Sequence, residues 1–213
     1  MKKRSKHKKT GLKYIVRITT FVSAWFLATL AMAQSLFDYP RTANFIVIEY
    51  SQILTMLEDQ DPIPLLRIYG DGRVLVHNPA YTKRAGDYEM QLSDAELQQL
   101  IASLELKGLF SYNKNNVAQL KQKSKARQLS ASATPITTMI SDDTYSEIKI
   151  NLGSYMPTTS RSPITNFNKK LSLKNLKSAA KDHPDVAALK DAAGAEEQLS
   201  TFLNHPELIK IRK

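Results

Sequence analysis

The stretch that decides the fold is LLRIYGDGRVLVH, residues 65–77. Two apolar, β-branched runs flank the Gly-Asp-Gly of residues 70–72. An Asp-Gly pair between such runs predicts a β-hairpin in which both turn residues accept positive φ. Farther along, Tyr88, Met90 and Leu92 alternate with polar neighbours, which indicates another strand with one buried face. This part of the chain therefore predicts an antiparallel meander.

A capped helix is expected directly after these strands. Ser93 can cap its N-terminus, and Glu96 can complete a capping box in which both side chains satisfy free backbone N–H groups. Lys107 suits the negative end of the helix, and Gly108 is a natural stop. Between these ends lies an apolar stripe at helical spacing: Leu97, Leu100, Ile101 and Leu104. The stripe must pack on the sheet, which predicts strands covered by a helix.

Further strands are expected on both sides of this block. Phe45–Ile48 opens an apolar run that favours a strand, with a helix over Ser51–Leu57 as the alternative. Ile148, Ile150 and Leu152 alternate with polar residues and predict a half-buried strand that returns to the sheet.

The C-terminal region, about 170–213, favours helices. We expect helices near residues 171–180, 184–193 and 195–203, after a loop at 153–168 that contains Pro157 and Pro163. The repeated His-Pro-acid sequence, at 183–185 and 205–207, is typical of a helix start with proline at the first position. The predicted fold class is α+β: a small antiparallel sheet (meander) covered by a capped amphipathic helix, with extra C-terminal helices.

The N-terminus has the three parts of a secretory signal peptide. Residues 1–33 hold eight basic residues and no acidic one, then an apolar core at 18–30, then Ala-Met-Ala. The 13-residue core is short for a membrane span, although an uncleaved anchor is the alternative. We therefore expect residues 34–213 to form a single domain that is periplasmic or secreted.

Charge and composition exclude several classes of protein. The formal net charge is +10, but without the leader 22 basic residues face 20 acidic ones, so the basic footprint of a nucleic-acid binder is missing. The absence of cysteine excludes disulfides, thiolate metal sites and cysteine nucleophiles.

The remaining positive charge concentrates in one segment. Residues 113–141 are expected to form a basic, loop-rich insertion, helical at most around Val117–Arg127. Its cations are the candidate partner-binding residues: Lys114, Lys121, Lys123, Lys125 and Arg127. They suit an anionic surface or an acidic protein, while a solvated loop without a partner is the simpler interpretation.

The block from Leu65 to Tyr112 resembles an uncharacterised bacterial domain of exported proteins. The resemblance is carried by Asp71-Gly72, by Gly86-x-Tyr88, and by the L-S-x-x-E-L motif of residues 92–97. It covers about a quarter of the chain and departs in the basic insertion and the C-terminal helices. It implies a strand-and-helix fold but brings no catalytic residues.

Catalytic and metal motifs are absent from the sequence. No two histidines of residues 34–213 have ligand spacing, and neither G-x-S-x-G nor S-x-x-K occurs, so we predict no cofactor and no metal. A hydrolase would have to combine His77 with Asp142, Asp143 and Glu147.

The sequence therefore favours a non-catalytic binding or accessory module whose partner is an envelope protein or an anionic surface. A protease-inhibitor-like module and a periplasmic hydrolase are the alternatives.

Overall fold

The computed structural model describes residues 36–54, 61–131, 144–157 and 162–212, all within one compact unit, Leu36–Lys213. The described residues form eight strands and four α-helices, which confirms the α+β fold class. The strands are β1 (Phe37–Asp38), β2 (Ile46–Leu54), β3 (Leu66–Tyr69), β4 (Arg73–Asn78), β5 (Gly86–Gln91), β6 (Thr144–Tyr155), β7 (Ile164–Lys174) and β8 (Ile209–Lys210). The helices are α2 (Asp94–Leu106), α3 (Lys114–Ala131), α4 (Leu176–Asp182) and α5 (Ala187–Thr201). The predicted leader, residues 1–33, and Asp142 and Asp143 lie outside the described residues.

The strands form one antiparallel sheet. Their order is β1-β6-β2-β3-β4-β5-β8. Strands β1 and β2 pair with opposite ends of one edge of β6, and β7 pairs along its other edge. The consecutive neighbours β3, β4 and β5 are the predicted meander, and β2 adds a further antiparallel strand beside β3. After α2 and α3, the chain returns as β6 and pairs with β2, which places Ile150 opposite Ile48. This confirms the predicted returning strand.

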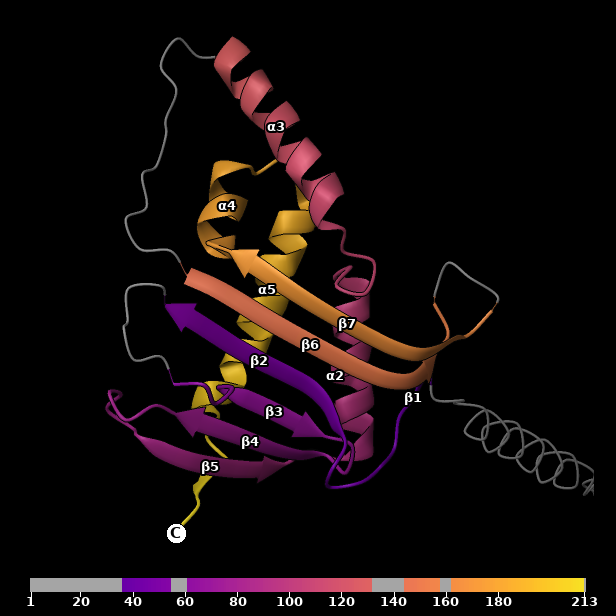
Figure 1. The fold of residues 1–213 in the computed structure, drawn as a ribbon, viewed down its shortest axis with the longest axis vertical. Coiled ribbons are helices and arrows are strands. Elements are labelled where there is room, and N and C mark those ends of the chain that lie inside the picture. The colour runs from indigo at the N-terminus through magenta and orange to yellow at the C-terminus, as the bar shows by residue number, and fades with distance from the viewer. Residues whose placement is uncertain (1–35, 55–60, 132–143, 158–161, 213) are drawn as a thin grey trace, which may run out of the picture. The chain divides into compact units, whose positions relative to one another are not determined.

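Helices α2 and α5 cover one face of the sheet (Figure 1). On that face Tyr50, Ile68 and Ile148 are completely buried, and they belong to the same apolar cluster as Leu199 of α5. The predicted stripe of α2 is buried in this cluster: Leu97, Leu100, Ile101 and Leu104. Removal of this apolar surface from water is the main force that holds the helices on the sheet.

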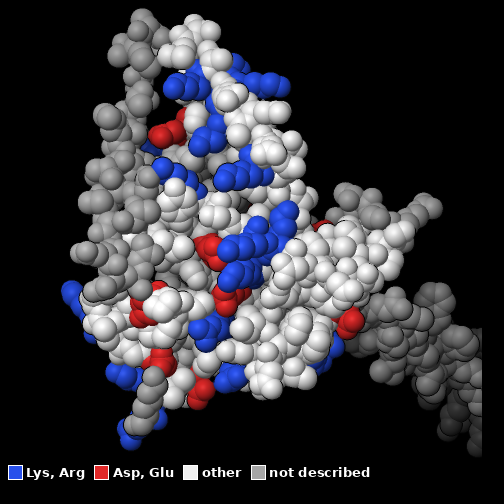
Figure 2. Space-filling view, viewed as in Figure 1, with Lys and Arg blue, Asp and Glu red and all other residues white. Residues whose placement is uncertain are grey.

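The opposite face of the sheet is charged. Lys149 Nζ lies 2.6 Å from Glu49 Oε1, and Lys170 Nζ lies 3.0 Å from Glu147 Oε2. Figure 2 views this face and shows basic and acidic side chains side by side over the sheet. The sheet therefore has one apolar and one solvated face, as is common for antiparallel sheets.

Both predicted ends of α2 are confirmed. The Glu96 amide donates to Ser93 Oγ at 3.3 Å, and the Ser93 amide donates to Glu96 Oε2 at 2.7 Å, which completes the capping box. At the other end Gly108 has φ +72°, and the amides of Gly108 and Leu109 donate to the carbonyls of Glu105 and Leu104. This is a Schellman motif, which requires a left-handed residue after the helix.

The hairpin between β3 and β4 is present, but its turn differs from the prediction. The Gly72 amide donates to the Tyr69 carbonyl at 2.9 Å, and Gly72 is the only residue of the turn with positive φ. The connection is a three-residue loop, so Asp71 does not adopt the positive φ that a two-residue turn demands.

Strand β7 replaces part of a predicted loop and part of a predicted helix. Residues 153–155 belong to β6, residues 164–168 to β7, and residues 171–174 continue β7. The pairing with β6 runs from Ile164 opposite Tyr155 to Lys174 opposite Tyr145. Likewise Ser51–Leu54 lies in β2, so the alternative helix is wrong for those residues. In both cases cross-strand partners decide the structure, and local composition does not show them.

The two His-Pro sequences form turns and do not begin helices. The Val186 amide donates to the His183 carbonyl at 3.0 Å, and the Leu208 amide donates to the His205 carbonyl at 3.2 Å. Helix α5 begins later, at Ala187, and continues through Gly194 as one helix where two were predicted.

The basic insertion contains a helix much longer than predicted. Helix α3 spans 18 residues, Lys114–Ala131. Asn113 Oδ1 accepts the amides of Asn115 and Asn116 at 2.9 and 3.2 Å, which caps the helix start. Alanine, glutamine, lysine and leucine favour helices. The prediction of a mostly irregular loop gave more weight to the polar composition of this segment than to these helix propensities.

Candidate functional site

The predicted partner-binding residues lie on α3, most of whose surface is exposed. Only Val117 and Ser124 of this helix are buried. Helix α3 carries five cations and no acidic residue, so nothing on the helix itself neutralises its charge. Figure 2 shows basic side chains gathered over α3.

The helix is attached to the turn between α4 and α5 by polar contacts. Ser124 Oγ donates to Asp185 Oδ1 at 2.5 Å and lies 3.1 Å from His183 Nδ1. Gln128 Nε2 donates to the Asp182 carbonyl at 2.7 Å. Burial, with Lys121 nearby, lowers the pKa of His183, so its neutral form is favoured at this contact.

The structure brings three of the five predicted cations together. With about 100° of rotation per residue, Lys114, Lys121 and Lys125 fall within about 40° of one another along α3. Arg127 lies on the other side of the buried face, where its guanidinium pairs with Asp185, and Lys123 lies on the far face. The candidate anion-binding row is therefore Lys114, Lys121 and Lys125.

Two further exposed cations were not singled out from the sequence. Lys177 and Lys181 are exposed and lie one turn apart on α4, which directly precedes the turn that holds α3. The signal was present in the charge count, since residues 106–181 hold 13 basic and three acidic residues. The predicted helix near residues 171–180 already contained Lys177, but only the denser cluster of cations at residues 113–141 was interpreted as a partner site.

His77, the centre of the predicted hydrolase site, is held between two carboxylates. Its Nδ1 lies 2.6 Å from Asp87 Oδ1, and its Nε2 lies 2.8 Å from Asp61 Oδ2. Burial alone would lower the pKa of His77, but the hydrogen bonds to Asp87 and Asp61 outweigh it and raise the pKa. Both ring nitrogens are engaged, so this histidine has no free nitrogen with which to take a proton from a substrate.

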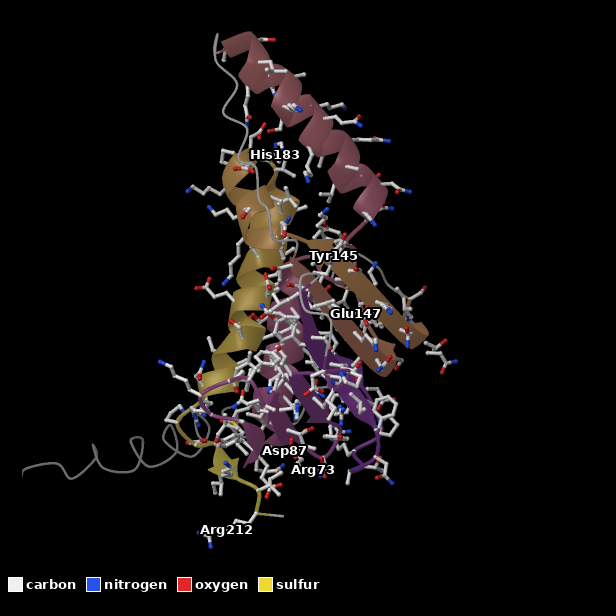
Figure 3. All side chains as sticks on the ribbon, turned by 60° about the vertical axis from the view of Figure 1, so that its left-hand side comes forward. Arg73, Asp87, Tyr145, Glu147, His183 and Arg212 are labelled. Carbon is white, nitrogen blue, oxygen red and sulfur yellow. The ribbon has the colours of Figure 1, made fainter. Side chains whose placement is uncertain are left out.

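Glu147 does not join His77. The strand register places the two residues three strand spacings apart across the sheet, about 14 Å. Figure 3 likewise separates Glu147 from Asp87, the partner of His77. Glu147 instead pairs with Lys149 and Lys170. The described residues of the predicted hydrolase site are therefore not assembled.

In the part of the chain that the structure describes, no three or more histidine, aspartate or glutamate residues are grouped so as to hold a metal ion. None of its helices is both long and apolar enough to cross a membrane.

Comparisons with protein-family models, with curated proteins and with solved structures find no match. The resemblance of Leu65–Tyr112 to a domain of exported bacterial proteins therefore stays a prediction.

Proposed function

We propose that this protein is an exported, non-catalytic binding module whose helix α3 engages an anionic surface of the cell envelope. The observation that supports it most is the exposed helix Lys114–Ala131, with five cations, no acidic residue and only two buried side chains. The leader predicted at residues 1–33 supports export.

The number of lysines in the candidate anion-binding row sets the expected strength of this interaction. A basic residue close to an anionic membrane surface contributes about 1 kcal/mol, so Lys114, Lys121 and Lys125 together contribute about 3 kcal/mol. Ions screen such interactions over about 8 Å at physiological salt. The proposed binding is therefore weak, reversible and sensitive to salt, which suits an accessory protein.

Sedimentation with lipid vesicles tests the proposal. Purified protein is mixed with phosphatidylglycerol vesicles or with neutral phosphatidylcholine vesicles. We expect binding to the anionic vesicles only, and at least a roughly tenfold loss for the triple variant Lys114→Ser, Lys121→Ser, Lys125→Ser. A matched control removes three exposed cations elsewhere, Lys83→Ser, Lys190→Ser and Arg212→Ser, and should retain binding.

Two outcomes contradict the proposal. One is equal loss in both triple variants, because the net charge alone would then explain binding. The other is no binding to anionic vesicles at low salt. If the protein instead binds an acidic polypeptide such as polyglutamate and no vesicle, the partner is an acidic protein and the membrane surface is excluded.

A further inference from the structure

A polar cavity of about 200 Å³ lies where β2, β6, α4 and α5 meet. Its walls come from residues far apart in the sequence: Gln52, Thr144, Ser146, Lys177, Ser178 and Glu196. None of these residues belongs to α3, so the cavity is separate from the surface proposed above.

Glu196 is the unusual residue of this cavity. Its side chain is on α5, and only 3% of the residue is exposed. Its Oε1 accepts three hydrogen bonds, from Ser146 Oγ at 2.5 Å, Tyr50 Oη at 3.2 Å and Gln52 Nε2 at 3.3 Å. Burial and the Glu196 carboxylate raise the pKa of Tyr50, so its hydroxyl stays protonated and donates.

The other oxygen of Glu196 has no donor. All three hydrogen bonds go to Oε1, and no described cation pairs with the carboxylate. Burial of a carboxylate is unfavourable unless the group is paired or fully hydrogen-bonded. Among the described residues, the only fully enclosed side-chain nitrogen or oxygen without a partner is Arg73 Nε, so Glu196 Oε2 still reaches the cavity.

Hydrogen bonds between Asn175 and Thr144 fix one wall of the cavity. Asn175, between β7 and α4, has the left-handed angles φ 47° and ψ 44°. Its Oδ1 accepts the Thr144 amide and its own amide donates to the Thr144 carbonyl, both at 2.8 Å. A non-glycine residue in this conformation is strained and persists only where its surroundings fix it. These contacts hold Asn175 and Thr144 in place, so a ligand would not have to order this wall, which favours binding.

We propose that this cavity binds a small zwitterionic amine. The ammonium group donates to Glu196 Oε2, and the anionic end meets the exposed Lys177 at the rim. A volume of about 200 Å³ holds roughly seven waters at about 30 Å³ each, so the ligand has about that number of non-hydrogen atoms. A small hydrophobic compound is excluded, because it would leave the carboxylate unpaired.

The test uses 4-aminobutanoate as the probe, with butylamine and butanoate as its two halves. Amide chemical shifts of the isotope-labelled protein are followed by NMR during each titration. We expect 4-aminobutanoate to shift the amides of Thr144, Ser146 and Ser178, butylamine to shift them with weaker affinity, and butanoate to leave them unchanged.

Two variants test the contacts of the ammonium group and of the anionic end of the ligand separately. Glu196→Gln retains the shape and the Oε1 acceptor but removes the charge, and should weaken 4-aminobutanoate at least tenfold. Lys177→Ser, at an exposed position, should weaken 4-aminobutanoate and leave butylamine unchanged. Lys181→Ser, one turn along the same helix, should change neither affinity.

Three results would overturn the proposal. They are no amide shift in this cavity up to about 10 mM of either amine, equal binding by butanoate, and unchanged affinity in Glu196→Gln. Should Glu196→Gln fail to fold, Lys177→Ser still decides, because equal affinity of that variant and the parent protein for 4-aminobutanoate also rejects the proposal.

Discussion

His77 Nε2 lies 2.8 Å from Asp61 Oδ2 and thereby ties the segment before β3 to the end of β4. The strength of this contact depends on pH. Hydrogen bonds to Asp87 and Asp61 raise the pKa of His77 against the opposing effect of burial. A backbone hydrogen bond from Ile63, together with His77, lowers the pKa of Asp61. At mildly acidic pH His77 is therefore protonated and Asp61 is ionised, so the two side chains form an ion pair.

We expect His77→Gln to destabilise the protein more at about pH 5.5 than at about pH 9.5. A raised folded-state pKa gives stability that is complete below the unfolded pKa of histidine, about 6.5, and disappears as pH rises through the folded value. The difference between the two conditions should be about 1 kcal/mol in the free energy of unfolding, measured by urea denaturation.

A double-mutant cycle with Asp61→Asn assigns this effect to the pair. The coupling energy between the two substitutions should be larger at the acidic pH than at the alkaline pH. A coupling energy that does not change with pH would mean that the contact is not an ion pair.

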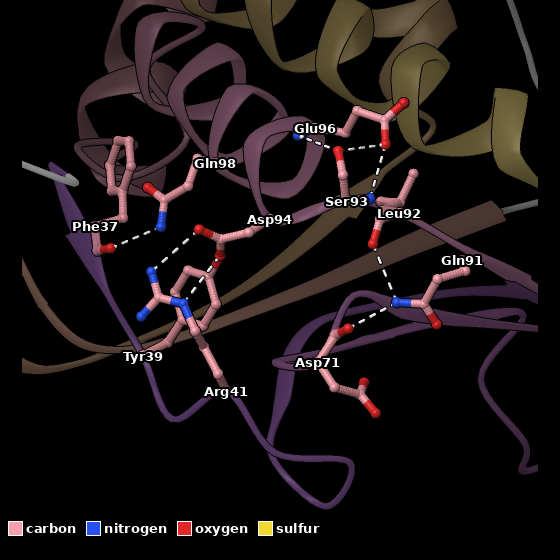
Figure 4. A network of polar contacts seen from close by, with 10 residues as sticks. All are labelled: Phe37, Tyr39, Arg41, Asp71, Gln91, Leu92, Ser93, Asp94, Glu96 and Gln98. Carbon is pink, nitrogen blue, oxygen red and sulfur yellow. Dashed lines mark hydrogen bonds and ion pairs between the residues drawn. The ribbon is translucent and has the colours of Figure 1, made fainter. Parts of the chain in front are cut away.

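Replacement of the α2 cap should destabilise the protein by about 1 kcal/mol. In Figure 4, Ser93 and Glu96 form the reciprocal cap, and the neighbouring Asp94 accepts hydrogen bonds from Tyr39 and Arg41. Ser93→Ala removes the side-chain acceptor of the Glu96 amide. Ser93→Asp is the control, because aspartate also caps helices, and it should retain most of the stability in thermal unfolding.

Local signals account for the parts of the fold that the sequence predicts. The β3–β4 hairpin and α2 depend on residues within a few positions of each other, such as Ser93 with Glu96, and both are confirmed. Strand β7 was missed because residues 165–170 are mostly polar and the pairing with β6 that orders them is not visible in the local sequence. The buried Leu171 and Leu173 alternate with polar neighbours, which is a strand signal, but they were included in the predicted helix near residues 171–180.

In the candidate sites, too, local sequence predicts some features and only the tertiary structure shows the others. The charge of α3 is a property of the sequence, so its cations were identified, but their arrangement around the helix was not. Glu196 was not singled out, because an acidic residue in an amphipathic helix is usually exposed. Only the tertiary structure brings Tyr50, Gln52 and Ser146 to one of its oxygens.

Loss of the buried Ser146 hydroxyl should destabilise the fold. Ser146 is 2% exposed and donates to Glu196 Oε1. Ser146→Ala removes that donor from a buried carboxylate, so we expect a loss of about 1–3 kcal/mol in urea denaturation. Ser172→Ala, an exposed serine on β7, is the matched control and should change stability by less than about 0.5 kcal/mol. Similar losses in both variants would show that Glu196 does not depend on this donor.

The attachment of α3 should depend on Asp185. This carboxylate accepts the Ser124 hydroxyl and pairs with Arg127, so Asp185→Ala removes two of the contacts that hold the helix. An isolated helix of this length is marginally stable in water. We therefore expect amide hydrogen exchange across Lys114–Ala131 to become at least about tenfold faster, while exchange in α2 stays unchanged. Asp191→Ala removes an exposed acid from α5 and serves as the control. Unchanged protection of α3 in Asp185→Ala would mean that other contacts, around Val117, hold the helix in place.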